Sequence, residues 1–359
     1  MGVFAKVITC ISLGILLVNA GGAFGQDLSD RIDGLFSAYN RPGVPGAAVA
    51  VFQNGEVLFQ RGYGAARLKN SDRVTGLTNF RLASLTKQFT AMAVMMLKED
   101  GKLAYDRPIT DYLTGFPEYA RTITVRHILN HTSGLRDYEE LIPPGMSRQL
   151  HDKDVVDILR RQNSTYFKPG SQYRYSNSGY ATLAHLVSEV SGQSFASFLK
   201  ERIFSVLDMG ATVAFEDGIS SVEQRAYGHT LTSGEYAETD QSQTSAVLGD
   251  GGVYTSLVDY FKWDQTLYTD QLVSSATLAE AFTPGHLSSG ATTGYGFGWQ
   301  LDTYRGYKRV GHTGSTIGFR SAVTRIPKLG LTVIVLVNRA NATPWETARQ
   351  ILDLVLDQK

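Results

Sequence analysis

The sequence predicts an α/β fold, in which a domain built around a β-sheet carries a mostly helical insertion. Two groups of strand-like segments support this prediction, one near the start of the chain and one after residue 295. Between them, from residue 108 to about 207, apolar residues recur mainly with helical spacing. Strands at both ends with helices between them indicate one domain assembled from the two termini, with a helical insertion.

The expected domain boundaries follow from this pattern. Residues 26–100 and 285–359 are predicted to form a discontinuous α/β domain, and residues 101–284 a mostly helical domain. The sequence contains no internal repeat and no linker rich enough in Gly, Pro or Ser to separate independent modules.

The composition is that of a globular protein with its own core. The 359 residues are 43% hydrophobic and 19% charged, and this length suits two domains or one larger unit. The 34 Lys+Arg residues balance the 34 Asp+Glu residues, which argues against nucleic acid or an anionic membrane as partners. The 36 Gly and 10 Pro residues follow no period, which excludes a collagen-like chain.

The first 25 residues have the pattern of an export signal. Lys6 supplies a positive charge, residues 7–18 form an apolar run too short for a membrane span, and cleavage is expected near Gln26. An uncleaved anchor and a buried core segment are the alternatives. The only cysteine, Cys10, lies in the apolar run, so neither a disulfide nor a Cys-rich zinc site is expected in the mature chain. We predict a bacterial protein that is periplasmic or secreted, with no stable membrane span after signal removal.

The first hundred residues predict a helix, a β-hairpin and a second helix. Residues 28–39 have amphipathic spacing, which is typical of a helix. The apolar runs 45–52 and 57–63 flank an Asn-Gly pair, and Asn-Gly between two such runs is the strongest short signal for a hairpin. The segment 84–100 is apolar on all sides and is followed by a glycine, which indicates a buried helix.

The rest of the chain adds further helices and then strands. Four helices are expected before residue 295, at 155–161, 180–190, 195–207 and 255–266. Four strands are expected after it, at 296–299, 307–310, 318–325 and 331–338. A helix at 346–356 is expected to close the chain.

The most informative chemical pattern is Ser-Leu-Thr-Lys at 84–87, which opens the buried helix. Residues three apart on a helix are neighbours, so Lys87 can reach the hydroxyl of Ser84. The helix amino terminus and burial both disfavour a protonated lysine, and a neutral lysine can act as general base for a serine nucleophile. A helix-capping Ser84 beside an exposed Lys87 is the alternative. A second match, Ser197-x-x-Lys200, lies in a surface-type helix and is interpreted as chance.

Tyr175-Ser176-Asn177 is the second pattern, in a loop that precedes the helix expected at 180–190. A tyrosine near a lysine can relay a proton or act as a phenolate base. The Asn177 amide can hold Lys87 and a substrate carbonyl. A polar loop with a helix cap is the alternative interpretation of this triplet.

His312-Thr313-Gly314-Ser315 is the third pattern. A glycine at this place would let a substrate backbone approach the edge of a strand closely. The backbone amide of Ser315 would then be the second donor to an oxyanion, with the amide of Ser84 as the first. A glycine turn between two strands is the alternative.

Other catalytic and metal-binding patterns are absent from the sequence or weak. Gly-x-Ser-x-Gly, His-Glu-x-x-His and Cys-x-x-Cys do not occur. His127 and His131 have the spacing of a metal-binding pair but no accompanying carboxylate, so a structural, hydrogen-bonded role is favoured. The glycine-rich stretch 294–298 has no following helix, which argues against a dinucleotide-binding loop. No metal ion or organic cofactor is expected.

In their order and spacing, the three patterns resemble those of the penicillin-recognising serine hydrolases, which include class C β-lactamases, D-Ala-D-Ala carboxypeptidases and related esterases. Four further stretches resemble that family, at 80–87, 127–135, 169–180 and 251–254. The resemblance covers the chain from about Asp30 to its carboxyl terminus. It implies Ser84 as the acylated nucleophile, Lys87 and Tyr175 as the proton-transfer pair, and Asn177 as an orienting residue. It also implies a β-lactamase/transpeptidase-like fold of the α+β type, in which an antiparallel β-sheet is flanked by helices and lies beside a mostly helical domain, with the active site in the cleft between the two domains.

One residue departs from the class C pattern, whose third triplet is usually Lys-Thr-Gly. His312 stands in place of the lysine, which resembles the carboxypeptidase and D-amino-acid peptidase branch. Histidine is mostly neutral at pH 7, whereas lysine offers a permanent cation to a substrate carboxylate. Carboxylate binding would then fall to Arg305, Arg309 or Arg320, and the sequence does not choose among them.

The sequence therefore predicts a serine hydrolase that works through a covalent acyl-enzyme. The favoured substrate is a D-Ala-D-Ala-type peptide or another D-amino-acid peptide. A small-ester or amide hydrolase and a class C-type β-lactamase on the same machinery are alternatives, as is a non-catalytic binder of peptidoglycan fragments. The expected partner is thus a peptide or other small molecule. Whether Lys87 or Tyr175 is the general base stays open at this stage.

Overall fold

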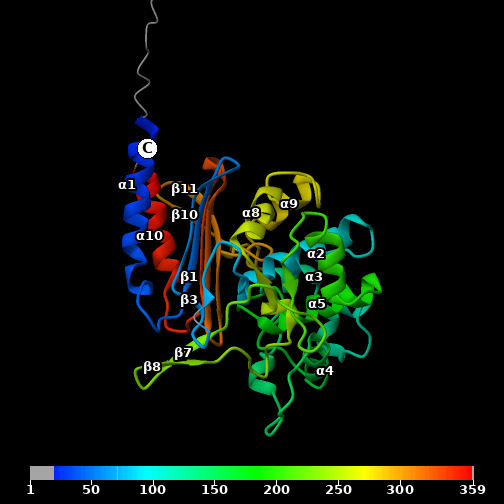
Figure 1. The fold of residues 1–359 in the computed structure, drawn as a ribbon. Helices are drawn as coiled ribbons and strands as arrows, with labels where there is room; N and C mark the ends of the chain where they lie inside the picture. Colours follow the sequence, from blue (N-terminus) through cyan, green and yellow to red (C-terminus); the bar gives the residue numbers. More distant parts are fainter. Residues whose placement is uncertain (1–19, 71, 358–359) are drawn as a thin grey trace, which may run out of the picture.

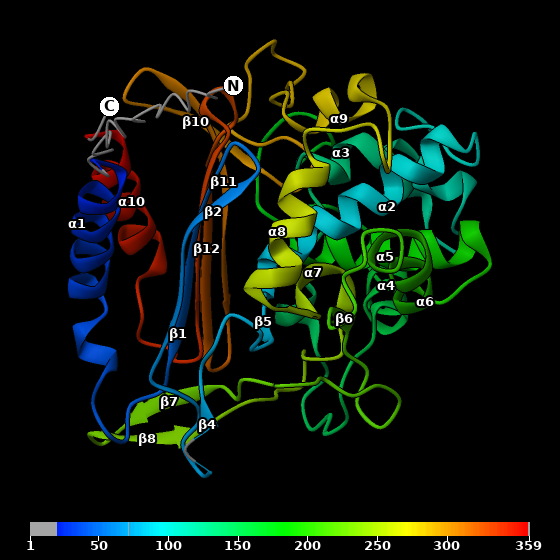
Figure 2. The ribbon, with the colours of Figure 1, turned by 45° about the horizontal axis from the view of Figure 1, so that its top comes forward.

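The computed structural model describes residues 20–70 and 72–357. Its largest sheet has six antiparallel strands in the order β10-β11-β12-β13-β1-β2, and Figure 2 shows this sheet between two groups of helices. The strands are β1 (Ala47–Gln53), β2 (Glu56–Tyr63), β10 (Gln300–Tyr304), β11 (Tyr307–Thr316), β12 (Phe319–Ile326) and β13 (Leu331–Val337). An antiparallel sheet flanked by helices confirms the predicted fold class.

The helices lie on both sides of the sheet. Figures 1 and 2 show α1 and α10 along one face and the other helices on the opposite side. The helices are α1 (Ala20–Leu35), α2 (Lys87–Glu99), α3 (Val125–Leu129), α4 (Asp152–Arg160), α5 (Asn177–Ser191), α6 (Phe195–Leu199), α7 (Leu248–Gly251), α8 (Leu257–Thr266), α9 (Ser275–Ala281) and α10 (Pro344–Leu356). Short strands outside the large sheet are β3 (Ala65–Arg67), β4 (Asp72–Arg73), β5 (Phe80–Arg81), β6 (Val213–Ala214), β7 (His229–Thr232), β8 (Glu235–Glu238) and β9 (Val253–Thr255).

The two ends of the chain meet inside the large sheet. β1 pairs antiparallel with β13, with Ala47 opposite Val337 and Gln53 opposite Leu331. The sheet therefore contains strands from both segments that the sequence assigns to a discontinuous α/β domain. The boundaries of that domain and of the helical domain remain a prediction.

The central strands β1 and β13 are buried on both faces of the sheet, and alternate residues of a strand point to opposite sides. On β1, Ala48 and Phe52 pack into the core that contains α2, whereas Val49 and Val51 pack into the core that contains α1 and α10. Burial on both faces explains why β1 and β13 are continuous apolar runs rather than alternating ones. The sheet is thus a rigid support for the groups carried by β11 and by the segment before α2.

The β1–β2 connection confirms the predicted hairpin. Asn54 and Gly55 link the strands with φ values of 52° and 83°. Positive φ at both central residues is the type I′ turn, whose twist matches that of the two strands and which Asn-Gly adopts most readily.

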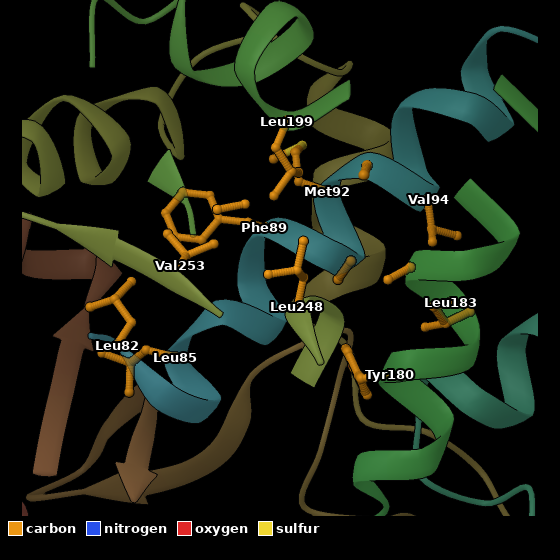
Figure 3. Close-up of a cluster of buried hydrophobic side chains, with 14 of the residues drawn as sticks. Leu82, Leu85, Phe89, Met92, Val94, Tyr180, Leu183, Leu199, Leu248 and Val253 are labelled. Atoms are coloured by element: carbon orange, nitrogen blue, oxygen red, sulfur yellow. The ribbon is translucent and has the colours of Figure 1, made fainter. Parts of the chain in front are cut away.

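Helix α2 is buried on every side, as its apolar composition predicts. All residues from Lys87 to Leu97 are buried. Figure 3 shows Phe89, Met92 and Val94 of α2 among side chains from α5, α6, α7 and β9. A helix enclosed in this way holds the residues at its start in fixed positions.

The prediction of a strand at 296–299 is wrong. These residues form a turn, and the strand β10 begins only at Gln300. Gly298 has a φ of 78°, and a Cβ at this residue would lie 2.7 Å from the backbone oxygen of Lys87. Gly298 therefore permits a close approach of this turn to α2.

Other predicted elements are found with different bounds. The strand expected at 307–310 continues as the much longer β11, and the helix expected at 84–100 begins as a 3₁₀ turn before α2. The helix expected at 195–207 divides into α6 and a π-helical turn, and α8 starts only after β9. The remaining predicted helices and strands overlap the observed ones.

The predicted export signal lies largely outside the described residues, which begin at Ala20 with α1. Within residues 20–70 and 72–357, no helix combines the length and the apolar character that crossing a membrane requires.

Candidate active site

Ser84 lies on a turn that presents one hydroxyl of an otherwise buried segment. The turn is the 3₁₀ helix η2 (Ala83–Thr86), which leads directly into α2. Ala83 has a φ of 51°, a left-handed conformation that costs a non-glycine residue roughly 1–2 kcal/mol. Between Phe80 and Leu97, Ser84 is the only residue that is not buried. A partly exposed serine on a strained turn has the accessibility that a nucleophile needs.

Lys87 is buried directly beneath Ser84 and contacts three oxygen atoms. Its Nζ lies 3.1 Å from the Oγ of Ser84, 2.9 Å from the Oδ1 of Asn177 and 2.9 Å from the backbone oxygen of Asp250. Burial lowers the pKa of Lys87 to about 8, and the carboxylates of Asp250 and Glu139 oppose this change. With such a pKa, about a tenth of the Lys87 side chains are neutral at pH 7.

The three contacts fix the direction of the Lys87 lone pair. A neutral amine has two N–H bonds and one lone pair. Asn177 Oδ1 and the Asp250 carbonyl can only accept hydrogen bonds, so they take both N–H groups of the neutral form. The lone pair is then left for the hydroxyl proton of Ser84. The geometry is therefore that of a general base and its nucleophile.

Tyr175 lies beside Lys87 with its ring rather than its hydroxyl toward the amine. The Nζ of Lys87 is 4.9 Å from the centroid of the Tyr175 ring. Burial raises the pKa of Tyr175, although the nearby Ser84 hydroxyl opposes part of the rise. In the described part of the chain, the buried Tyr175 hydroxyl has no hydrogen-bond partner. At neutral pH, Tyr175 therefore retains its proton and is suited to donate it rather than to act as a base.

Asn177 is the first residue of α5 and its amide is fixed at both ends. The Oδ1 accepts from Lys87 at 2.9 Å, and the Nδ2 donates to the Oε1 of Glu139 at 3.2 Å. Ser176 caps the helix by accepting a hydrogen bond from the Gly179 amide. The amide of Asn177 thus holds Lys87 as expected, while its N–H₂ group is engaged by Glu139.

His312 is buried in β11 and is held in one neutral tautomer. Its Nδ1 lies 2.6 Å from the backbone oxygen of Thr313, so Nδ1 carries the proton and Nε2 accepts from the Tyr295 hydroxyl at 2.8 Å. Burial and the neighbouring Lys87 lower the pKa of His312 to about 3. His312 therefore stays neutral across the physiological range, and the structure gives it no role as a cation for a substrate carboxylate.

Gly314 brings β11 against the turn that carries Ser84. A Cβ at Gly314 would lie 2.2 Å from the backbone oxygen of Leu82 and 2.2 Å from the Oγ of Ser321. The space of this glycine is therefore filled by the protein itself, and not left for a substrate backbone as the sequence suggested. This close approach places Ser315 on the same small cavity as Ser84, with a volume of about 50 Å³.

Two carboxylates that sequence reasoning missed line this cavity as well. Glu139 is exposed, and Asp250 is buried and accepts a hydrogen bond from the Tyr138 hydroxyl at 3.1 Å. Desolvation raises the pKa of both carboxyl groups, by full burial for Asp250 and by the surrounding protein for Glu139. Neither has a spacing from Ser84 that a local pattern could reveal, because separate segments bring them there. The only sequence signal is that Asp250 stands among three glycines at 249–252.

Two of the three arginines considered for a substrate carboxylate are engaged elsewhere. Arg305 pairs with Asp353 of α10 and with Asp357, the residue that follows this helix. Arg309 forms a bidentate pair with Asp302 of β10. Both guanidinium groups are therefore occupied by carboxylates of the protein itself.

Arg320 donates to the backbone oxygens of Thr316 and Phe319. Its neighbour on β12, Ser321, donates to the backbone oxygen of Leu82 beside the active site. Because adjacent residues of a strand point to opposite faces, Arg320 leaves the sheet on the face away from Ser84.

His127 and His131 have separate structural roles. The Nδ1 of His127 accepts from the Thr124 amide at the start of α3, and the Nδ1 of His131 accepts from the Ser176 amide. Among residues 20–70 and 72–357, no group of three or more His, Cys, Asp or Glu side chains could hold a metal ion.

Comparison with known proteins agrees with this geometry. The family model described as Beta-lactamase matches residues 32–357. The chain belongs to the beta-lactamase family. This is a family of serine hydrolases, and the predicted family and fold are thereby confirmed.

Relatives within the beta-lactamase family are similar over most of the chain. Penicillin-binding protein 4* of Bacillus subtilis is 32% identical over 338 residues, which cover 90% of this chain and 74% of the relative. D-aminopeptidase of Brucella canis is 29% identical over 300 residues, which cover 82% of this chain and 56% of the relative. The solved structure of D-amino acid amidase from Ochrobactrum anthropi SV3, in complex with L-phenylalanine amide, is 26% identical with a TM-score of 0.77 and covers 92% of this chain and 98% of that one.

Proposed function

We propose that this protein is a serine hydrolase that forms a covalent acyl-enzyme on Ser84 and acts on D-amino-acid peptides or amides. Neutral Lys87 takes the Ser84 proton while Oγ attacks the acyl carbonyl carbon, and the backbone amides of Ser84 and Ser315 stabilise the oxyanion. Tyr175 donates its proton to the leaving amine, and the Lys87 ammonium then restores that proton to Tyr175. Water hydrolyses the resulting ester and frees Ser84.

The observation that carries this proposal is the environment of Lys87. A buried amine with a lowered pKa, two acceptor-only partners and the Ser84 hydroxyl as its third neighbour has the geometry of a general base. Tyr175, with a raised pKa and an unpartnered buried hydroxyl within the described residues, complements it as an acid. The two groups have opposite roles because burial favours the neutral form of each, which is a base for Lys87 and an acid for Tyr175.

The charge of the cavity supports a substrate with a free amine. Glu139 and Asp250 line the cavity, and Arg81, the one arginine on it within the described part of the chain, is buried and donates to Ser245 and Gly251. A protonated α-amine would be attracted by these carboxylates, whereas a terminal carboxylate would be repelled. An aminopeptidase or amidase acting on a D-amino acid therefore fits this site better than a D-Ala-D-Ala carboxypeptidase. The names of the Brucella and Ochrobactrum relatives are consistent with that choice.

The edge of β11 supports a peptide as part of the substrate. β10 pairs with β11 only as far as Gly311. From His312 to Thr316, the only strand paired with β11 among those described is β12, on one side. An extended peptide can add to an open edge through main-chain hydrogen bonds. Such a peptide would pass the cavity that holds Ser84 and Ser315.

A substrate panel tests the proposal, with kcat/KM measured for the wild type and for Ser84→Ala. The panel contains D-alanine p-nitroanilide, its N-acetyl derivative, an N-acyl-D-Ala-D-Ala peptide, a short-chain p-nitrophenyl ester and a chromogenic cephalosporin. We expect the free-amine substrate to exceed its acetylated form by about tenfold or more, which corresponds to about 1.4 kcal/mol. A preference for the ester or fast cephalosporin turnover would replace the proposed substrate class. Activity that persists in Ser84→Ala would contradict the proposed nucleophile.

Export belongs to the same proposal. The signal-like residues 1–25 would deliver the protein to the bacterial periplasm or the medium, where D-amino-acid peptides released from peptidoglycan occur. Mass analysis of the amino terminus of the mature protein, with cleavage expected near Gln26, tests this part independently of catalysis.

A further inference from the structure

The backbone of α7 supplies one of the three oxygens around Lys87, and three of its carbonyls accept hydrogen bonds from side chains of other elements. The carbonyl of Gly249 accepts from the Oγ1 of Thr90 at 2.7 Å, that of Asp250 from Lys87 at 2.9 Å, and that of Gly251 from Arg81 at 3.2 Å. Three consecutive carbonyls are therefore each held by a different side chain. The position of the Asp250 carbonyl depends on how firmly α7 is fixed.

The other end of α7 is held by one carboxylate. Asp152, the first residue of α4, is buried, and its two oxygens accept from the backbone amides of Leu248 at 3.0 Å and Gly249 at 2.9 Å. Asp152 and Thr90 thus hold the same peptide segment from two sides, one at its amides and one at a carbonyl. Neither side chain has a contact with Ser84 among the hydrogen bonds of the described residues.

We propose that Asp152 and Thr90 are positioning residues, which act through α7 to hold the Asp250 carbonyl against Lys87 and so aim the lysine lone pair at Ser84. The inference rests on the proposed function, because it assigns a purpose to the base position of Lys87. It differs from a purely structural role, since a misplaced carbonyl would disturb the base without unfolding the protein. A displacement of about 1 Å at such a group can lower a rate by about a hundredfold.

Several ionisable groups lie around Lys87, and among them Asp250 and Glu139 act on its pKa. The groups around Lys87 are Asp250, Glu139, Tyr138, Tyr175, Tyr180, His131 and His312. Asp152 and Arg81 interact electrostatically with Asp250. Both histidines are held neutral by burial, which lowers their pKa values. The ammonium of Lys87 is therefore stabilised mainly by the Asp250 and Glu139 carboxylates and by the hydrogen bonds that it donates.

The test is the rate of acylation of Ser84 as a function of pH, measured with a p-nitrophenyl ester under single-turnover conditions. In Asp152→Asn, the amide places an N–H₂ donor against one of the two backbone amides. We expect the acylation rate at high pH to fall by about tenfold or more. The pH below which the acylation rate declines should become lower, because the Lys87 ammonium loses an aligned acceptor and its pKa therefore falls. Thr90→Val should act in the same direction, and Thr90→Ser, which keeps the hydroxyl, should restore the wild-type profile.

Asp157→Asn is the matched control, since Asp157 lies on the same helix α4 and, among the residues that the structure describes, pairs only with Lys153 and Arg160. It should leave rate and profile unchanged. If both Asp152→Asn and Thr90→Val showed the acylation rate and the pH dependence of the wild type, the inference would be overturned. So would a loss of activity that matches the loss of folded protein, with the pH limb unmoved. If the wild type itself forms no acyl-enzyme, the proposed function fails, and this inference fails with it.

Discussion

The Nζ of Lys87 lies 3.1 Å from the Oγ of Ser84, and its other two partners are oxygens that cannot donate a hydrogen bond. Lys87→Arg tests the meaning of this contact, because arginine keeps the positive charge but cannot be deprotonated in a protein. We expect the acylation rate to fall by about 10²–10⁴-fold, the usual contribution of a general base. Lys200→Arg, in the second Ser-x-x-Lys match, is the control and should retain full activity. Equal rates for Lys87→Arg and the wild type would exclude Lys87 as the base.

The pH dependence of kcat/KM should report the pKa of Lys87. Burial lowers that pKa to about 8, and the neutral form is the active one. The rate should therefore rise about tenfold per pH unit below about 8 and level off above it. Asp250→Asn removes a carboxylate that stabilises the ammonium, so the limb should move to lower pH. A rate that is constant between pH 6 and pH 9 would contradict this assignment.

Glu139→Gln should change substrate selectivity more than it changes the chemistry. The exposed carboxylate lines the cavity beside Ser84 and is expected to attract the free amine of a D-amino-acid substrate. We predict that kcat/KM falls by about tenfold for D-alanine p-nitroanilide, or about 1.4 kcal/mol, and by much less for its N-acetyl derivative. Glu140→Gln is the control, because Glu140 accepts from Tyr166 outside the cavity. An equal loss for both substrates would show that Glu139 acts on the chemistry through Asn177 instead.

Gly314→Ala should destabilise the protein and disturb Ser84 together. The new Cβ would lie 2.2 Å from the backbone oxygen of Leu82, so β11 and the turn η2 would have to separate. Overpacking of this kind costs about 1–3 kcal/mol, and acylation should slow more than the loss of folded protein explains. Gly34→Ala in α1 is the control, because nothing lies within 4 Å of its added Cβ. If Gly314→Ala unfolded at the same temperature as the wild type, the close approach of β11 to the turn η2 would be refuted.

His312 should make the folded state sensitive to acid. Its pKa is about 3 in the folded protein and about 6.5 when unfolded, so between these values the unfolded state binds the extra proton. The free energy of unfolding should therefore decrease as pH falls below about 6.5, by up to about 1.4 kcal/mol per pH unit for this group. In His312→Gln, which keeps an acceptor for Tyr295, denaturant unfolding between pH 4 and pH 6 should show a smaller slope. His286→Gln, at an exposed histidine, should not reduce the slope.

The elements that could be predicted from the sequence are those whose signal is local. The Asn-Gly hairpin depends on two residues with positive φ, and the burial of α2 follows from its lack of a polar face. The turn at 296–299 could not be recognised, because its Gly298 permits a contact with α2, which is distant in sequence. In the same way, Gly314 is needed because β11 lies against Leu82, and no local pattern in the sequence indicates this contact.

The candidate site divides along the same line. The structure brings Ser84, Lys87, Asn177 and Tyr175 together, and places Ser315 on the same cavity. The carboxylates around them could not be predicted, because no pattern relates Glu139, Asp250 or Asp152 to Ser84 in the sequence. The charge of a site depends on groups from several segments. It is therefore the property that sequence patterns reveal least. In this protein the charge of the site favours a substrate recognised by its free amine over one recognised by its terminal carboxylate.

The most direct test of the account is intact-mass analysis of the full chain after treatment with a fluorophosphonate, followed by peptide mapping. The account predicts one adduct per chain, located on Ser84, no adduct on Ser84→Ala, and slow labelling of Lys87→Arg. Labelling of the wild type to the same extent as Ser84→Ala, or an adduct on Ser197, would contradict it.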